Sequence, residues 1–418
     1  MLCHLALGVY LIAWIGEGRW NQKWEIARHQ PLIWGFLSFF ALHLMGISYS
    51  EDVANGWFNV EKKLTFFLLP ALMATTLSLD KKAVQLLFKG FIMTCVVTTL
   101  VCLWGAYGNY QNQTDQINFD SASLTLFQQL NVDAKSPWIF FSYIGLASSV
   151  GMHPTFLSLY LVFSILLLIH LSADSFVSYS LLAKTGIVLL FIYLESIMVL
   201  LSSRTLIIGF TFILIAGFFH LFGTLHLRPI TRMLVIAGSL APLVLILIAN
   251  PVGRYRTFQE PGIFETYQAT SDGVYTYSTG IRKSLWKAGL QAIGQVNPLF
   301  GAGTGDVKQA VKEASNLSGD SNILQSYDPH NQFIYTQIGL GFTGLASLLM
   351  CFYLPCWFAY REKNYFYLVF LLLITMVCST ESALESQKGI VFFSIFNSLL
   401  VFQYFNPVTI PLKKPGYG

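Results

Sequence analysis

Long apolar runs alternate with short polar connections along almost the whole chain. Most of these runs are long enough to cross a bilayer core as helices, which takes about 20 apolar residues per crossing. Ten of them, and an eleventh that starts near Met1, cover residues 31–48, 64–79, 84–106, 154–171, 185–203, 205–223, 233–249, 331–358, 365–380, 389–405 and 2–16. The pattern predicts an all-α, polytopic integral membrane protein with about 11–12 transmembrane helices.

The composition supports this prediction and argues against a soluble globular enzyme. Of the 418 residues, 54% are hydrophobic and only 11% are charged. The first run lacks the basic start and the small-residue cleavage site of a secretory signal, so we interpret it as a span. The cysteines all lie within apolar runs and lack metal-ligand spacing, which favours packing roles. They are Cys3, Cys95, Cys102, Cys351, Cys356 and Cys378.

Lysine and arginine residues in the short connections predict the orientation of the spans. Positive charge is retained on the cytoplasmic side, and the basic residues occupy alternate connections. They are Arg19, Lys23, Arg28, Lys81, Lys82, Lys184, Arg228, Arg232, Arg361, Lys363, Lys413 and Lys414. These connections are therefore predicted to be cytoplasmic, and the intervening ones to face the opposite side. Counting back from a cytoplasmic C-terminus leaves Met1 outside, which is compatible with a further helix upstream.

One connection is much longer than the others and divides the chain into three segments. Residues 1–249 form the first group of spans, residues 250–330 the long loop, and residues 331–418 the closing spans with a short tail. Thr279 as a cap and the apolar stripe after it predict a helix from about 280 to 295, with Arg282 and Trp286 on one face. The loop is therefore expected to be partly helical.

A glycine-rich stretch, Asn297–Asp306, follows this predicted helix. Asp306 is expected to cap a short helix over residues 307–314. A glycine turn at the start of a helix can hold phosphate through backbone N–H groups. An ordinary tight turn explains the same residues, and no strand and crossover surround them as in nucleotide-binding folds. Both interpretations stay open at this point.

The end of the loop carries the most specific pattern. His330 and Asn331 stand where the chain returns to the membrane, and Gly339, Gly341 and Gly344 follow in the next span. A proline-led glycine turn, a spacer, His-Asn and a glycine-patterned apolar helix together resemble the O-antigen ligase and Wzy-type polymerase superfamily. The order of many spans, one large loop and a few closing spans is similar over nearly the whole chain. Arg204, Arg282 and the triplet His153–Thr155 are also similar to positions in this superfamily.

The resemblance implies a GT-C-like glycosyltransferase in the inner membrane of a Gram-negative cell, with its active site facing the periplasm. Such an enzyme transfers a glycan from a polyprenyl (undecaprenyl) diphosphate carrier to a sugar hydroxyl of lipid A core, with inversion at the anomeric carbon. Its partners are the donor lipid, the acceptor lipid and the bilayer. No cofactor and no nucleic acid are expected.

The residue chemistry fits this reaction. Fixed arginines can match the charge of a diphosphate leaving group without a metal, and Arg204 and Arg282 are the catalytic candidates, with Arg254 and Arg256 behind them. A histidine that titrates near neutral pH can accept the acceptor's proton, and His330 is the best-placed one. Asn331 and His153 are further substrate-binding candidates. The chain contains no Asp-x-Asp motif, so no metal is expected.

Each candidate also has a plainer interpretation. Arg204 could extend to the headgroup region, and Arg282 could be a solvated cation beside other lysines. Arg254 and Arg256 could contact anionic lipids, and His330 with Asn331 could merely cap a helix.

Several acids complete the set of candidates. Glu195 lies in the middle of an apolar run, where an acid is a functional candidate by default; a structural partner elsewhere in the bundle is expected. Glu381, Glu385 and Lys388 have the spacing of one helical face, and either border a cavity or form a salt-bridge cluster.

Three other functions remain as alternatives. A Wzy-type polymerase uses a second lipid-linked repeat unit as acceptor, and a protein O-oligosaccharyltransferase uses a serine or threonine hydroxyl. A transporter of the lipid-linked glycan belongs to a different class. Transporters usually show internal repeats and broken helices at the membrane midplane, and the sequence shows neither an obvious repeat nor matched interruptions.

Overall fold

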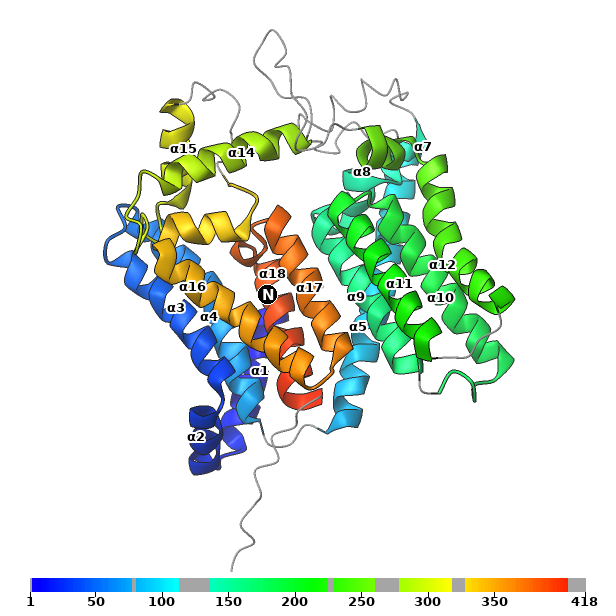
Figure 1. The fold of residues 1–418 in the computed structure, drawn as a ribbon, viewed down its shortest axis with the longest axis horizontal. Coiled ribbons are helices and arrows are strands. Elements are labelled where there is room, and N and C mark those ends of the chain that lie inside the picture. The colour runs from blue at the N-terminus through cyan, green and yellow to red at the C-terminus, as the bar shows by residue number, and fades with distance from the viewer. Residues whose placement is uncertain are drawn as a thin grey trace, which may run out of the picture. The chain divides into compact units, whose positions relative to one another are not determined.

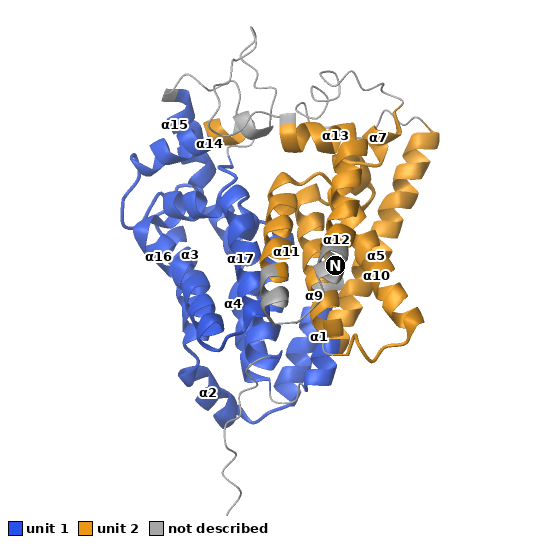
Figure 2. Ribbon diagram, turned by 45° about the vertical axis from the view of Figure 1, so that its right-hand side comes forward, with its two compact units in different colours: residues 1–85, 285–418 blue, residues 86–284 orange. Residues whose placement is uncertain are grey.

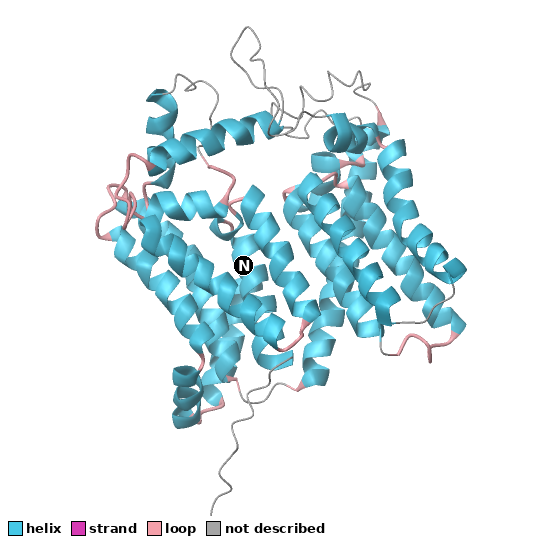
Figure 3. Ribbon diagram, viewed as in Figure 1, coloured by secondary structure: helices cyan, strands magenta, loops and turns pink. Residues whose placement is uncertain are grey.

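The computed structural model describes residues 2–76, 80–112, 136–173, 175–224, 229–259, 278–317 and 328–404. Across these ranges the chain is helical and forms no β-strand, apart from an isolated bridge between Asn297 and Gly301. Figure 3 shows helices throughout the described part of the chain. The expected all-α fold class is confirmed.

Each of the eleven apolar runs forms a helix (Figure 1). These are α1 (Leu2–Gly16), α3 (Pro31–Ile47), α4 (Val53–Thr75), α5 (Lys81–Gln111), α9 (Pro154–Ala173), α10 (Leu181–Leu200), α11 (Arg204–Thr224), α12 (Pro229–Ala249), α16 (Gln332–Arg361), α17 (Tyr365–Thr380) and α18 (Gln387–Ser398), which continues as the π-helix η4 (Leu399–Tyr404). By length and apolarity, 4 of the described helices could each cross a membrane, or up to 6 spans result if each bent helix pair counts as one. The protein is therefore a polytopic membrane protein, and the count of eleven spans stays a prediction.

The helices form two compact units, which Figure 2 colours separately. Unit 1 comprises residues 1–85 and 285–418, and unit 2 comprises residues 86–284. This grouping cuts across the three segments predicted from the sequence, because the first four helices pack with the closing spans. The helix α14 (Ser278–Ile293) begins in unit 2 and ends in unit 1.

In unit 1, α3 packs against α4 and α16, α4 against α18, and α16 against α17. Phenylalanine rings fill the space between these helices; Phe36, Phe66, Phe352, Phe370 and Phe393 are joined by successive ring contacts. Ser38 and Ser347 share a hydrogen bond of 2.9 Å between α3 and α16.

The cysteines whose side chains the structure describes, Cys95, Cys102, Cys351, Cys356 and Cys378, are free thiols and four of them are buried, in agreement with packing roles.

The helix directions in unit 1 agree with the predicted alternation of basic connections. Gly35 contacts Cys351 and Gly46 lies beside Leu340, so α3 and α16 are antiparallel. The short helix α2 (Trp20–His29), bent by 83° from α3, therefore lies at the same end of the unit as Arg361. Which side of the membrane this end faces stays a prediction. Arg228, Lys413 and Lys414 lie outside the described residues.

The glycine-rich stretch inserts into a break in α16. Gly341 has φ 60° and ψ −158°, which interrupts the helix. The break frees two helical N–H groups, and those of Phe342 and Thr343 donate instead to the carbonyls of Pro298 and Leu299. Two carbonyls of α16, at residues 338 and 339, accept from the N–H groups of residues 302 and 303. The loop thus satisfies backbone groups that a break in a membrane helix would leave unpaired.

This arrangement rules out the phosphate-cradle interpretation of the glycine stretch. Every backbone N–H from residue 299 to residue 306 donates to an acceptor within the protein. The glycines are needed for close packing, since a Cβ on Gly301 would lie 2.5 Å from the backbone of Gly339. Asp306 does not cap the next helix with its side chain; its two carboxylate oxygens accept from the N–H groups of Glu51 and Asp52 at 2.8 Å. The predicted short helix is present as α15 (Val307–Leu317).

The break in α16 lies within one of the predicted spans, where the sequence showed no matched interruptions. A second interruption separates α12 from α13 (Pro251–Arg254), with a bend of 98°. In α16 the carbonyls of Ile338 and Gly339 accept from the glycine-rich stretch, whereas the broken helices of transporters use such carbonyls to coordinate ions.

Substitution of Gly341 is expected to destabilise unit 1. An alanine would adopt an unfavourable positive φ and place its Cβ 2.4 Å from the carbonyl carbon of Leu299. We expect Gly341→Ala to cost roughly 2–4 kcal/mol, visible as a lower unfolding temperature in detergent. Gly35→Ala in α3 is the control, because nothing lies within 4 Å of its Cβ. Equal stability of the two variants would contradict the role given to Gly341.

Unit 2 is built around the hairpin of α9 and α10, with α12 against α10 and α11 against α9. The short helices α7 (Pro137–Phe140) and α8 (Tyr143–Ala147) pack against α13. Their buried cluster joins Ile139, Phe140 and Tyr143 to Val252. A π-helix, η2 (Tyr255–Gln259), follows α13 directly and carries Arg256.

Candidate functional site

His330 is held in a strained backbone conformation at the start of α16. Its φ is 46°, in the left-handed region that non-glycine residues rarely adopt. Its N–H donates to Oδ1 of Asp328 at 2.9 Å, and its carbonyl accepts from Nε1 of Trp286 at 3.4 Å. Such strain persists where surrounding contacts enforce it, and it concentrates at functional sites.

The imidazole of His330 is paired with a carboxylate. Its Nδ1 lies 2.9 Å from Oε2 of Glu381, which ends α17. The side chain of His330 is 34% exposed, whereas that of Glu381 is 9% exposed. A carboxylate accepts a hydrogen bond, so Nδ1 carries the proton and Nε2 is the basic nitrogen. The pair therefore has the arrangement of a general base with an orienting acid.

A buried ion pair supports the turn that carries Glu381. Lys63 of α4 and Glu385 lie 2.5 Å apart, with side chains 2% and 8% exposed. Gln332 donates to the other oxygen of Glu385 at 2.9 Å and accepts from the N–H of Leu384 at 2.7 Å. These contacts fix the turn because a buried charge is stable only when it is paired and hydrogen-bonded.

The predicted helical face of Glu381, Glu385 and Lys388 is wrong in its geometry. Glu381 ends α17, residues 383–385 form the short 3-10 helix η3 (Ala383–Glu385), and α18 begins at Gln387. The two acids therefore point to different partners, His330 and Lys63, instead of sharing one cluster.

Asn331 acts as the cap of α16. Its Oδ1 accepts from the N–H groups of Phe333 and Ile334, and its Nδ2 donates to the carbonyl of Ser379 at 2.9 Å. This is the helix-capping role weighed in the sequence. The contact with Ser379 ties the His330 segment to α17, so Asn331 helps to position His330.

Arg282 lies on α14, which confirms the helix predicted over residues 280–295. The helix begins at Ser278, so Thr279 lies inside it and not at its cap. Arg282 is partly buried and precedes Trp286 by one helical turn. Trp286 itself donates from Nε1 to the carbonyl of His330.

Two arginines of unit 2, Arg204 and Arg256, each donate from Nε to a backbone carbonyl. Arg204, the first residue of α11, donates from Nε to the carbonyl of Arg256 at 2.7 Å. Arg256 donates from Nε to the carbonyl of Ser202 at 3.3 Å, and its guanidinium lies 3.7 Å from the centre of the Tyr143 ring. Arg256 is only 8% exposed. These bonds leave the outer nitrogens of its guanidinium for another acceptor.

The environment of Arg256 is suited to an anion. Within the described residues no carboxylate forms an ion pair with Arg256. Tyr143 and Ser202 both have positive φ, 47° and 52°, as His330 does. A buried cation without a counter-ion is costly and gains most from an anionic ligand, and guanidinium groups bind phosphate oxygens in pairs. We refer to Arg204 and Arg256 together as the arginine pair.

The remaining candidates lie in different surroundings. Arg254 is exposed on α13. His153 is exposed, and its Nδ1 accepts from the N–H of Thr155 at 3.3 Å at the start of α9, which is a capping contact. Glu195 is fully buried in α10, but neither of its carboxylate oxygens has a hydrogen-bond partner among the described residues. The structural partner expected for Glu195 is therefore absent from this part of the chain.

A protein-family model described as O-antigen ligase matches residues 186–349. This segment is similar to that family. The resemblance seen in the sequence is thus confirmed over this segment, and it supports a ligase- or polymerase-type function in general. No curated protein matches the chain.

The segment matched by the family model contains His330 and the arginine pair, but not all of the residues that contact them. Arg204, Arg256, Arg282 and His330 lie inside residues 186–349, whereas Glu381 and the Lys63–Glu385 pair lie outside. His153 also lies outside this segment.

Sequence reasoning missed Lys63 altogether. The signal was present, because Glu61, Lys62 and Lys63 are three successive charges inside the apolar helix α4. Charges within a membrane helix are rare and mark functional or paired groups. Sequence reasoning also ranked Arg256 with Arg254, which the structure separates by burial.

Proposed function

We propose that the chain is an O-antigen ligase that transfers a glycan from a polyprenyl (undecaprenyl) diphosphate carrier to a sugar hydroxyl of lipid A core. The reaction is inverting and metal-independent and takes place on the periplasmic side of the inner membrane. The observation that carries the proposal is the His330–Glu381 pair, with Nδ1 2.9 Å from the carboxylate. The match to the O-antigen ligase family supports the general type of reaction.

In the proposed reaction, the oxygen of an acceptor hydroxyl attacks the anomeric carbon of the donor glycan. Its proton passes to Nε2 of His330, and the resulting imidazolium is stabilised by the carboxylate of Glu381. The bond between the anomeric carbon and the phosphate oxygen breaks, and both of its electrons leave with the polyprenyl diphosphate. Attack opposite the leaving group inverts the anomeric configuration.

The departing diphosphate gains negative charge, which the guanidinium groups match. The arginine pair is preorganised for this task, since each Nε already bonds a backbone carbonyl. Preorganised donors that face developing charge provide a large share of catalysis in many enzymes. Arg282 is assigned the same role from its place on α14, one turn before Trp286.

A transfer assay with purified protein tests the proposal. Undecaprenyl-diphosphate glycan and lipid A core are mixed with the protein in detergent, with EDTA and without nucleotide or ion gradient. We expect glycosylated lipid A core to form. Chain growth on the donor alone would support a Wzy-type polymerase, and glycan on a serine or threonine of a protein acceptor would support an O-oligosaccharyltransferase. A transporter would form no product.

A further inference from the structure

Three successive charged residues of α4 have three different environments. Residues on an α-helix are offset by about 100° each, so Glu61, Lys62 and Lys63 point in different directions. Lys63 is buried against Glu385. Lys62 is half-buried, donates to the carbonyl of Glu385 at 3.3 Å and lies 4.7 Å from the centre of the Phe58 ring. Within the described residues neither Glu61 nor Lys62 forms an ion pair.

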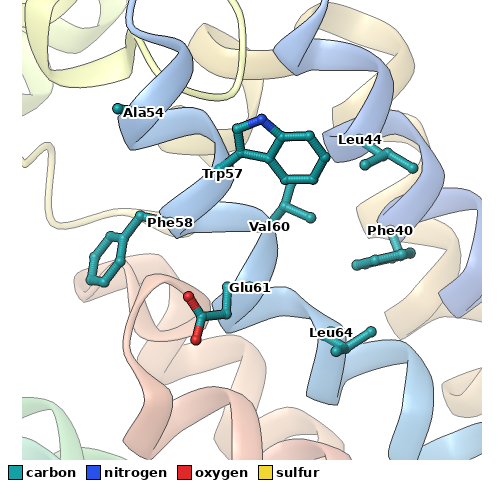
Figure 4. A pocket seen from close by; sticks show the side chains of 8 residues that line it. All are labelled: Phe40, Leu44, Ala54, Trp57, Phe58, Val60, Glu61 and Leu64. Carbon is teal, nitrogen blue, oxygen red and sulfur yellow. The ribbon is translucent and has the colours of Figure 1, made fainter.

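A lateral apolar groove lies beside these charges on unit 1. It has a volume of about 560 Å³ between α3 and α4 and is lined by Phe40, Leu44, Ala54, Trp57, Phe58, Val60, Glu61 and Leu64. Figure 4 shows Phe40 and Leu44 on α3, the side chains of α4 beside them, and Glu61 as the charged group in the wall. Trp57 and Phe58 are 56% and 59% exposed, so the groove is open on the outer surface of the helices of unit 1.

One lining residue of the groove, Phe58, has the centre of its ring 4.7 Å from the ammonium group of Lys62, which does not itself line the groove. This ammonium group bonds the carbonyl of Glu385, in the turn that also carries Glu381. Lys62 also interacts electrostatically with Asp328, whose carboxylate holds the N–H of His330. A headgroup bound at Lys62 would therefore lie beside the turn that positions the histidine.

We infer that the α3–α4 groove, with Lys62 and Glu61, binds an acylated, phosphorylated glycolipid, which is the acceptor of the transfer reaction. The apolar wall packs against an acyl chain, the Lys62 ammonium binds a phosphate, and the Glu61 carboxylate accepts hydrogen bonds from sugar hydroxyls. The assignment as acceptor rests on the proposed function, while the lipid site itself does not. The diphosphate donor is assigned to the arginine pair instead, because guanidinium groups bind phosphate oxygens in pairs.

The test measures binding of diphosphoryl lipid A to the full-length protein in nanodiscs without any donor. Lys62→Gln is expected to weaken binding about tenfold, as is Leu64→Trp, which fills the groove. Lipid A with its phosphates removed is expected to bind wild type about tenfold more weakly and to be insensitive to Lys62→Gln. The matched controls on α5 are Lys89→Gln and Leu86→Trp, both at exposed positions, and should bind as wild type does.

Unchanged binding in both Lys62→Gln and Leu64→Trp would overturn the inference, even if the transfer reaction proceeds. Displacement of lipid A by undecaprenyl phosphate, with the same dependence on Lys62, would assign the groove to the donor and also overturn it. Conversely, Lys62-dependent binding of lipid A without any transfer product would refute the proposed function and leave the lipid site in place.

Discussion

Replacement of His330 by alanine is expected to lower the rate of glycan transfer by roughly 10²–10⁴-fold, because general base catalysis contributes about that much. The donor should still bind, since the arginine pair belongs to a different part of the chain. The effect is measured as kcat and KM for the donor, with the unfolding temperature to confirm folding.

Two further variants distinguish the loss of the general base from a change in backbone strain at residue 330. Asparagine tolerates the left-handed backbone of residue 330 but cannot act as a base, so His330→Asn should be as slow as His330→Ala and at least as stable. Glu381→Gln keeps a hydrogen-bond acceptor but removes the charge, and should cost about 10–100-fold in kcat, the loss of a charge-assisted hydrogen bond. A wild-type rate in His330→Asn would remove the histidine from the mechanism.

Replacement of Arg256 by lysine should be nearly as damaging, with a loss of about 10²–10³ in kcat. Lysine keeps the positive charge but loses the planar fork and the stacking on Tyr143. The Nε contact to the Ser202 carbonyl is lost as well. The measurement compares kcat for transfer from an undecaprenyl-diphosphate donor at saturation.

Arg254→Lys is the matched control for Arg256→Lys, because it makes the same change two residues earlier. Arg254 is exposed, whereas Arg256 is only 8% exposed, and the backbone carbonyl of Arg256 accepts a hydrogen bond from Nε of Arg204. Only a small change is expected in Arg254→Lys. If the two variants lost activity equally, general attraction to anionic lipids would explain both arginines, and the arginine pair would not be a specific site.

The apolar pattern predicted the helices well because hydrophobic length is a local property of the chain. The helix of Arg282, the short helix after Asp306 and most of the apolar runs appear within a few residues of their expected positions, whereas α4 begins at Val53, well before the run at 64–79. Local signals could not reveal that Asp306 binds the α3–α4 connection, since its partner N–H groups lie 254 and 255 residues away.

The candidate site was predictable in its residue types but not in its pairings. His330 was found from its place at the end of the loop, but Glu381, 51 residues later, was assigned to the wrong neighbours. Arg256 could not be distinguished from Arg254 because the bend after α12 and the π-helix η2 decide which guanidinium is buried. The glycine motif predicted a special backbone without revealing that the loop completes a broken helix.

Unit 1 is built from two segments that lie far apart in the chain, and this has a consequence for membrane insertion. Residues 1–85 leave the ribosome long before residues 285–418, and Lys63 must wait for Glu385, 322 residues further along the chain. At about 5–20 residues per second this interval lasts on the order of 15–60 s. During it, the ammonium group of Lys63 in α4 lacks its partner carboxylate, and an unpaired charge within a membrane helix is costly. The first four helices are therefore expected to stay with the insertion machinery until the closing spans are synthesised.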